Sequence, residues 1–238
     1  MAASPSIEAS AVSVPAPGLA GNRGSLWLDR PSTAQRVADA LRERMWCGEL
    51  QAGAQVGELQ LTVALGVSRN TLREAFQILI GERLLTREPH RGVFVRRLTA
   101  DDVRDVYAFR RLVECAAVGH PAQPRGLVEM RTALKEGQTA ARRKAWHDVG
   151  TADVRFHMGV AALGGSARLD RVMRALFAEL RLAFQLVPDP RALHEPFLSL
   201  NAEIYALAEQ GDSSRASLRL RAYLDEAEAV IVAAVEGG

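Results

Sequence analysis

The segment GVSRNTLREAF (66–76) gathers side chains that can bind nucleic acid. Within about two helical turns it offers two arginines, a serine, an asparagine and a threonine. These residues are Ser68, Arg69, Asn70, Thr71 and Arg73. An arginine can form two hydrogen bonds with a guanine edge, and the smaller polar side chains can reach bases or phosphates. Two arginines alone are more often solvated surface, so the surrounding elements must decide.

A second pair that could do chemistry is Asp153 and His157 in TADVRFHM. Residues four apart share one face of a helix, so this carboxylate and imidazole could both bind a metal. The spacing is weak support by itself, because a surface hydrogen-bonded pair, or an acid beside a core histidine, is the commoner interpretation. Both interpretations stay open on these residues alone.

The elements around Ser68 follow the order of a helix-turn-helix. An amphipathic helix over 32–47 ends at Gly48, and a short helix covers 58–65. After the Gly66 turn, Ser68 is a good N-cap residue for the next helix. The opposite face of that helix is apolar and carries Leu72, Ala75, Phe76, Leu79 and Ile80.

Two short β-type runs, LLTRE and GVFVRR, follow this helix and predict a hairpin, or wing. Its tip, with His90 and Arg91, could enter a minor groove or meet the DNA backbone. The formal net charge of +2 excludes a global basic field, but residues 83–97 hold five arginines against Glu88 alone. A winged helix-turn-helix domain is therefore predicted over residues 32–98.

The chain beyond Thr99 is predicted to be helical almost throughout, and Thr99 and Asp102 resemble a capping box at its start, with Asp in place of Glu. Breaks rich in glycine and proline separate expected helices over 99–119, 125–145, 147–163, 167–187, 191–210 and 213–235. Residues 1–31 are rich in Ala, Ser, Pro and Gly without any period, which predicts a disordered arm. The expected fold class is mainly α: an N-terminal winged helix-turn-helix (32–98) and a C-terminal all-α helical bundle (99–238).

Several classes of protein are disfavoured by the same sequence. Its two cysteines have no CxxC spacing, which favours a reduced, cytoplasmic protein. The longest apolar run near the C-terminus (229–235) is too short to cross a membrane, and the N-terminus lacks the basic start of a signal peptide. The nucleotide-binding motifs GxGxxG and GxxxxGK[ST] and the zinc-protease motif HExxH are absent.

The N-terminal motifs resemble the winged-helix domain of the GntR family of bacterial transcription regulators. The matching pieces are LRERMWCGELQAG, Glu58 followed by Leu61, LGVSR, LREAF and RGVFV. The resemblance implies DNA contacts by the recognition helix and the wing. They fall on Ser68, Arg69, Asn70, Thr71 and Arg73, and on His90, Arg91 and Gly92. Many relatives have Thr-Pro in place of Asn70-Thr71, and some contact DNA with an arginine in place of Leu59, so the operator sequence is expected to be this protein's own.

The continuation LTADDVRDVYAFRRLVECAA resembles the first helix of a FadR/FCD-type effector domain. Such domains typically hold a divalent metal with the Asp and His of D-x-x-x-H and two further histidines. Here those two positions fall on Asn201 and Tyr223. The resemblance implies either a degenerate site of Zn, Ni or Mn type at Asp153, His157 and Asn201, or a metal-free pocket in which these residues and Tyr223 bond the effector directly.

An effector with a carboxylate also needs a cation to bind it. Arg110 matches the family's R-x-x-x-E position, and Arg181 lies on a later helix. Each could bind a carboxylate in fork geometry, whereas a solvated arginine, or one paired with Glu114, is the alternative. The expected effector-binding residues are Arg110, Arg181 and Tyr223.

Together these features predict a ligand-responsive DNA-binding transcription regulator, most simply a repressor, and not an enzyme. It would bind a palindromic double-stranded operator as a homodimer, because two-fold proteins read two-fold sites, and a small carboxylate would shift its operator affinity. The alternatives are a metal-dependent enzyme using Asp153 and His157, for which no nucleophile motif is present, and an effector-independent DNA-binding protein. Convergence of Arg110, Asp153, His157 and Asn201 on one enclosed polar cavity would discriminate between them.

Overall fold

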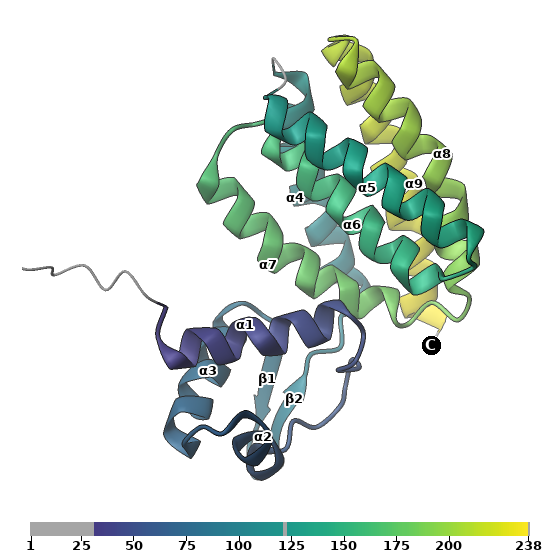
Figure 1. Cartoon of the computed structure of the whole chain (residues 1–238). Coiled ribbons are helices and arrows are strands. Elements are labelled where there is room, and N and C mark those ends of the chain that lie inside the picture. The colour runs from purple at the N-terminus through teal and green to yellow at the C-terminus, as the bar shows by residue number, and fades with distance from the viewer. Residues whose placement is uncertain (1–30, 121–122, 238) are drawn as a thin grey trace, which may run out of the picture. The chain divides into compact units, whose positions relative to one another are not determined.

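The computed structural model describes residues 31–120 and 123–237, and the part from Ser32 onward forms one compact unit (Figure 1). The predicted disordered arm lies outside the described residues, apart from Pro31. Helices dominate the described chain, and the only strands in it form one two-stranded sheet. The predicted fold class, mainly α with a winged helix-turn-helix before a helical bundle, is confirmed.

The winged helix-turn-helix is built from three helices and a hairpin. They are α1 (Thr33–Trp46), α2 (Glu58–Leu65), α3 (Arg69–Gly81), β1 (Leu85–Glu88) and β2 (Gly92–Val95). Gly66 ends α2 in the left-handed region, at φ +63°, which a glycine adopts without strain. The strands are antiparallel, with Leu85 opposite Val95. The apolar stripe predicted for α3 is buried at Leu72, Ala75, Phe76 and Leu79 and partly buried at Ile80.

The C-terminal bundle consists of six helices within the described residues. They are α4 (Ala100–Gly119), α5 (Pro124–Arg142), α6 (Trp146–Ala162), α7 (Ala167–Phe184), α8 (Pro190–Glu209) and α9 (Ser213–Gly237). The predicted capping box at Thr99 is present, since its hydroxyl accepts from the Asp102 backbone N–H and the Asp102 carboxylate accepts from Thr99. Two helices end earlier than predicted. Lys144, at φ +58°, follows α5, and Pro188 restricts the chain after α7.

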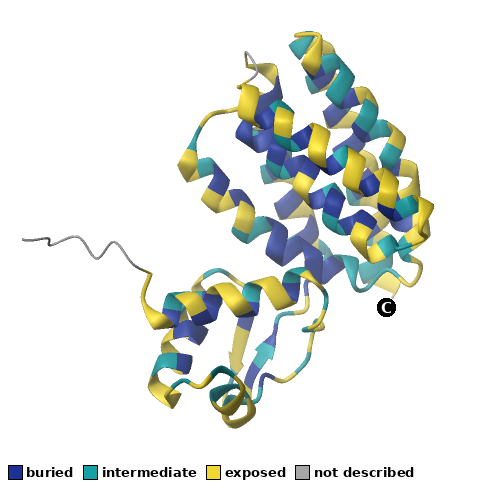
Figure 2. Ribbon diagram, in the orientation of Figure 1, coloured by how far each residue is buried: buried dark blue, intermediate teal, exposed yellow. Residues whose placement is uncertain are grey.

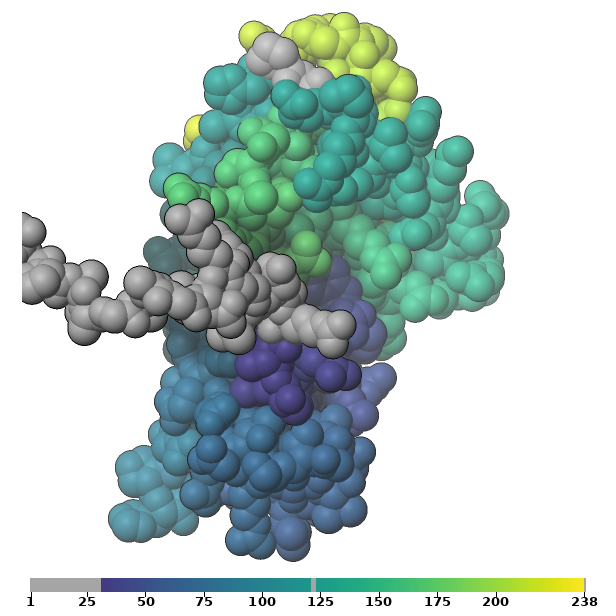
Figure 3. Space-filling view, turned by 60° about the vertical axis from the view of Figure 1, so that its left-hand side comes forward, coloured from purple at the N-terminus to yellow at the C-terminus, as the bar shows by residue number. Residues whose placement is uncertain are grey.

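The bundle core forms where the helices turn their apolar faces inward, as the dark blue positions show (Figure 2). Helices α5 and α6 pack closely where α6 carries Gly159. A side chain at this position would come within 2.8 Å of the Met130 backbone nitrogen, so only a glycine permits the approach. Side chains of these two helices lie side by side over one face of the bundle (Figure 3). Among the described helices, none is long and apolar enough to cross a membrane.

Candidate DNA-binding surface and effector-domain cluster

The first turn of α3 presents polar side chains to solvent. Ser68 is the N-cap, and its hydroxyl accepts from the Thr71 backbone N–H at 3.1 Å. Ser68, Arg69 and Asn70 are exposed, as is Arg73, whereas Thr71 is half-buried and shares a hydrogen bond with the Ser68 hydroxyl. A helix N-terminus with free N–H groups and exposed arginines can bind phosphate and reach base edges.

The two arginines of α3 differ in what they contact. Arg73 donates to Glu58 of α2 at 3.2 Å, across the helix-turn-helix. Asn70 donates to Glu74 at 2.9 Å within α3. Arg69 forms no ion pair in the described part of the chain, so its guanidinium is the more available for a ligand.

The turn of the wing places its predicted residues at an exposed tip. His90 and Gly92 both have positive φ values, of 62° and 108°. Arg91 pairs with Glu88 and lies over the Phe94 ring, 5.3 Å from its centroid. His90, Arg91 and Gly92 are all exposed, so the backbone geometry holds them at the surface as the sequence predicts. Their role in binding DNA stays a prediction.

In the bundle, four sequence-predicted residues converge from three helices. Asp153 of α6 accepts hydrogen bonds at the same oxygen from the Asn201 amide of α8, at 2.7 Å, and from the Tyr223 hydroxyl of α9, at 2.9 Å. The ring of His157 packs against that of Tyr223, with centroids 4.8 Å apart. Burial by itself would raise the pKa of Asp153, but His157, His194 and these hydrogen bonds outweigh it and lower the pKa.

A buried ion pair lies next to this network. Arg110 donates to one oxygen of Glu114 at 2.6 Å, and His157 bonds the other oxygen through Nδ1, also at 2.6 Å. Burial would raise the pKa of Glu114, but Arg110 and then His157 reverse that effect and lower it. Glu114 thus fixes both neighbours. Its pairing with Arg110 is the alternative that the sequence offered for this arginine, whereas its contact with His157 was missed. Only its spacing from Arg110 was visible, because His157 is distant in the chain.

Three polar atoms in these two groups have no protein partner although they are fully buried. They are Arg110 Nη2, His157 Nε2 and Asn201 Oδ1. The cavity that Asp153, His194 and Asn201 border measures only about 10 Å³. This is roughly the space of one water molecule. Asp153 and Asn201 border this cavity, but Arg110 and His157 do not, so the four residues do not converge on one enclosed polar cavity. In this conformation the cavity has no room for an organic ligand.

The donor set does not fit a tightly held divalent metal. The Oδ1 atom of Asp153 already accepts two hydrogen bonds, and burial together with Asp153 holds the pKa of Tyr223 well above its ordinary value, so Tyr223 is a neutral phenol and a poor metal ligand. Zn²⁺ sites in proteins use several Cys, His or carboxylate ligands. Within residues 31–120 and 123–237, no three such side chains come together as they would around a metal.

Arg181 of α7 lies apart from the Arg110–Glu114 pair. Its Nε donates to the Trp46 carbonyl at 2.8 Å, and its Nη2 donates to the His147 carbonyl at 3.0 Å and to the Thr151 hydroxyl at 3.1 Å. It lines a separate cavity of about 530 Å³. The three residues predicted to bind an effector therefore lie in two places. Arg110 and Tyr223 belong to the closed cluster, and Arg181 lies beside an open pocket.

Comparisons with known proteins agree with both halves of this architecture. The family model described as bacterial regulatory proteins, gntR family, matches residues 33–95, and the FCD domain model matches residues 105–226. The crystal structure of a putative GntR transcriptional regulator from Rhodococcus sp. RHA1 is similar, with a TM-score of 0.80 and 41% identity over 85% of this chain and 99% of that chain.

Two curated relatives are transcriptional repressors by name. A probable D-xylose utilization operon repressor from Paenarthrobacter nicotinovorans is 30% identical over 76% of this chain and 84% of that protein. The gluconate operon repressor of Bacillus licheniformis is 36% identical over 88 residues, which are 37% of this chain and 36% of that protein. With a DNA-binding domain and an FCD domain in this order, the chain belongs to the gntR family of bacterial transcription regulators, which are not enzymes.

Proposed function

We propose that this regulator is a repressor that binds a palindromic operator as a homodimer and that a small carboxylate controls its affinity for DNA. The observation that carries the DNA-binding part is the capped first turn of α3, where exposed polar groups stand above a buried apolar stripe. The repressor assignment follows the names of the relatives from Paenarthrobacter and Bacillus. Two-fold symmetry of the operator follows from the geometry of dimeric helix-turn-helix proteins.

Each predicted residue of this surface has a proposed role. Arg69 and Arg73 read bases, because their guanidinium groups can each form two hydrogen bonds with guanine. The other polar residues contact phosphates or neighbouring bases and hold the helix in register. They are Ser68, Asn70 and Thr71 of α3 and His90, Arg91 and Gly92 of the wing.

The effector domain is proposed to work without a bound metal. Asn201 and Tyr223 both donate hydrogen bonds to Oδ1 of Asp153, and these bonds stabilise the buried carboxylate without a cation. Arg110 and Tyr223 could bond a carboxylate directly only after the bundle opens, since the cavity beside Asp153 and Asn201 has room for about one water molecule. The ligand acts as an effector because it binds two arrangements of the protein unequally.

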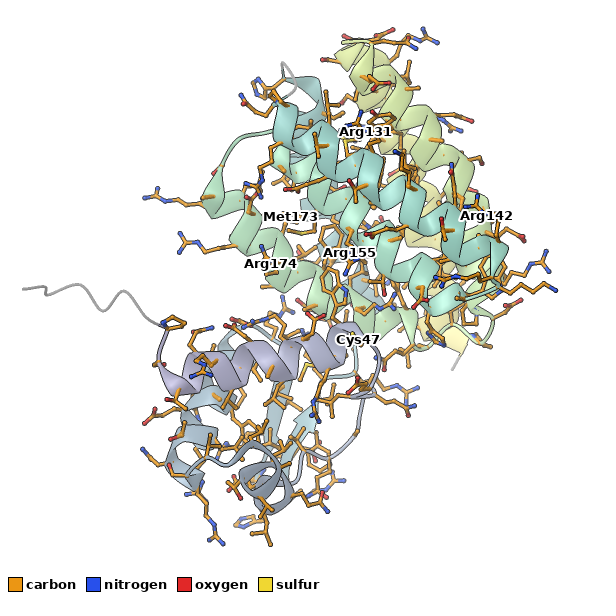
Figure 4. All side chains as sticks on the ribbon, viewed as in Figure 1. Cys47, Arg131, Arg142, Arg155, Met173 and Arg174 are labelled. Atoms are coloured by element: carbon orange, nitrogen blue, oxygen red, sulfur yellow. The ribbon has the colours of Figure 1, made fainter. Side chains whose placement is uncertain are left out.

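The DNA-binding proposal is tested by replacing Arg69 with alanine. Operator fragments selected from a random DNA pool with the native protein serve as the probe. Arg69→Ala should weaken binding to them by about 1–3 kcal/mol, the usual contribution of a base-reading arginine. The matched control is Arg142→Ala, an exposed arginine at the end of α5 (Figure 4). Equal operator affinity of Arg69→Ala and native protein would contradict the assignment of α3.

The metal-free proposal is tested by elemental analysis of native protein purified without chelators, next to His157→Ala. We expect no stoichiometric transition metal in either sample, and no change in melting temperature of native protein when Zn²⁺ or Ni²⁺ is added. Stoichiometric metal in native protein that is lost in His157→Ala would show that Asp153 and His157 hold a cation after all.

A further inference from the structure

A pocket of about 530 Å³ lies beside Arg181 and is formed by four segments of the chain. Its walls come from the end of α1 and the turn after it, the start of α6, the end of α7 and the start of α8. Cys47, labelled in Figure 4, lies at the α1 wall. This volume falls within the range of about 300–1,000 Å³ that small-molecule sites occupy. The closed cavity beside Asp153 is far smaller.

Two arginines of the described residues are buried, Arg110 and Arg181, and they are paired differently. Arg110 bonds the Glu114 carboxylate at 2.6 Å. Arg181 is 4% exposed, yet its hydrogen bonds go only to two carbonyls and a hydroxyl, and in the described part of the chain no carboxylate lies within 4.0 Å of it. Burial lowers the pKa of Arg181, which reflects the cost of a cation out of water without an anion in contact.

The Nη1 atom of Arg181 lies directly against a glycine of α6. A side chain at Gly150 would clash with Arg181 Nη1 and with His194 Nε2, so both nitrogens lie over the same bare stretch of α6. Nη1 makes none of the three hydrogen bonds of Arg181. His194 is 5% exposed and has no hydrogen bond within the described residues. Both side chains are buried, and both line the pocket, so two nitrogens without a hydrogen bond in the described residues lie together at its wall, where an anion could bind.

The rest of the wall indicates what kind of anion fits. One guanidinium supplies a single positive charge, which suits a monocarboxylate better than a doubly charged phosphate. Phe184, Leu186 and Pro190 add apolar surface to the same pocket. Gln51 and Gln185 add polar groups that could bond substituents of an organic acid.

We infer that this pocket binds a small organic monocarboxylate, with its carboxylate against Arg181 Nη1 and His194 Nε2 and its organic body along Phe184 and Pro190. This inference rests on the proposed function and specifies its effector site. The Trp46 carbonyl, which Arg181 bonds, closes α1 of the DNA-binding domain, so a ligand at Arg181 lies against both domains. Binding there changes which arrangement of the two domains is favoured, and thereby operator affinity.

The test measures binding of sodium acetate and sodium benzoate to the full-length protein by isothermal titration calorimetry, at ionic strength matched with sodium chloride. Benzoate should bind more tightly than acetate, because it also covers the apolar wall. Gly150→Ala places a methyl group against Arg181 Nη1 and His194 Nε2 and displaces both nitrogens from the proposed carboxylate position, so it should weaken benzoate binding by about tenfold or more. The matched control, Gly119→Ala, adds a methyl group where nothing lies within 4 Å and should bind as the native protein does.

A second variant addresses the guanidinium itself. Arg181→Gln should abolish benzoate binding, whereas Arg191→Gln, on the exposed side of α8, should leave it within about twofold. If Arg181→Gln fails to fold, the Gly150→Ala comparison and the shift of the His194 ring signals by NMR on adding benzoate decide the outcome. Unchanged binding in Gly150→Ala, no binding of either carboxylate, or tighter binding of inorganic phosphate than of benzoate would overturn the inference.

Failure of this inference is distinguishable from failure of the proposed function. Operator binding is measured for native protein and Gly150→Ala without any carboxylate. Equal operator binding by both proteins, with no benzoate binding by either, would leave the regulator intact and remove this site. Loss of operator binding in Arg69→Ala tests the DNA-binding surface alone, because Arg69 lies on α3 and does not line the pocket.

Discussion

The polar residues of α3 and those of the bundle interior are used in opposite ways. On α3, exposed side chains keep few internal partners, and the ion pair from Arg73 to Glu58 lies in solvent. In the bundle, Arg110, Glu114 and His157 are almost completely buried and bond one another. An exposed ion pair contributes about 0–1 kcal/mol and can be exchanged for a ligand, whereas breaking a buried one costs several kcal/mol.

The difference shows which arginines of this fold can exchange a protein carboxylate for a ligand at low cost in stability. A surface arginine can leave its carboxylate for a phosphate or a base at little cost in stability. The buried Arg110 cannot leave Glu114 without stranding two charges. Arg181 combines features of both, since it is buried like Arg110 but lacks a contacting carboxylate, like Arg69.

Removal of Glu114 should have the largest effect on stability. Glu114→Ala leaves the charge of Arg110 buried without a partner and frees Nδ1 of His157. We expect the free energy of unfolding to fall by about 3–5 kcal/mol. Urea denaturation at pH 7, followed by circular dichroism, measures it.

The control for this experiment is an exposed carboxylate with the same kind of partner. Glu195→Ala removes a bond of 2.9 Å to Arg191 on the surface of α8 and should cost about 0–1 kcal/mol. A loss below about 1 kcal/mol for Glu114→Ala would mean that the interior pair is as exchangeable as a surface pair, and the contrast with α3 would disappear.

Lowering the pH should cause the next largest loss of folding stability, because His194 is buried. Burial is the main reason that the pKa of His194 falls to about 4. Arg181 and His147 also disfavour its charge, and Asp153 opposes them. The unfolded chain, with a pKa near 6.5, takes up this proton first as pH falls, so stability is present above about pH 6.5 and is lost toward pH 4.

The measurement compares native protein with His194→Gln from pH 7 to pH 4. Native protein should lose about 3 kcal/mol more stability than the variant across this window. His90→Asn, at the exposed turn of the wing and outside this pocket, is the control and should follow the native curve. Parallel curves for native protein and His194→Gln would show that His194 is not held neutral.

Sequence patterns predict the local features of both regions and only part of the contacts in the second. The Ser68 cap, the apolar stripe of α3 and the Thr99 capping box depend on residues a few positions apart, so periodicity and side-chain chemistry suffice. Family spacing places Asn201 and Tyr223 correctly beside Asp153. The contact of Glu114 with His157 and the position of Arg181 against Trp46 depend on how distant helices pack, which no local pattern encodes.

Loss of the Tyr223 hydroxyl should have a smaller effect than either interior change above. Tyr223→Phe removes one of the two donors to Asp153 and leaves the Asn201 amide in place. Because Asp153 is charged and Tyr223 is buried, we expect a loss of about 1–3 kcal/mol in the free energy of unfolding by urea. Tyr205→Phe, whose hydroxyl bonds Glu209 at the surface of α8, should change it by less than about 1 kcal/mol. A neutral or stabilising Tyr223→Phe would indicate that this hydroxyl is not needed to hold Asp153.

The smallest change in stability is expected at the exposed pair of the DNA-binding domain. Glu58→Gln removes the charge that Arg73 contacts at 3.2 Å and should alter the free energy of unfolding by about 0–1 kcal/mol. Operator affinity should nevertheless rise, because Arg73 is released for DNA and a carboxylate near the phosphates is neutralised. Fluorescence anisotropy at two salt concentrations measures it, with Glu74→Gln as the control for a carboxylate on α3 that contacts Asn70. Weaker operator binding by Glu58→Gln would instead mean that the ion pair holds Arg73 in its DNA-reading position, so that even the exposed region depends on internal pairing.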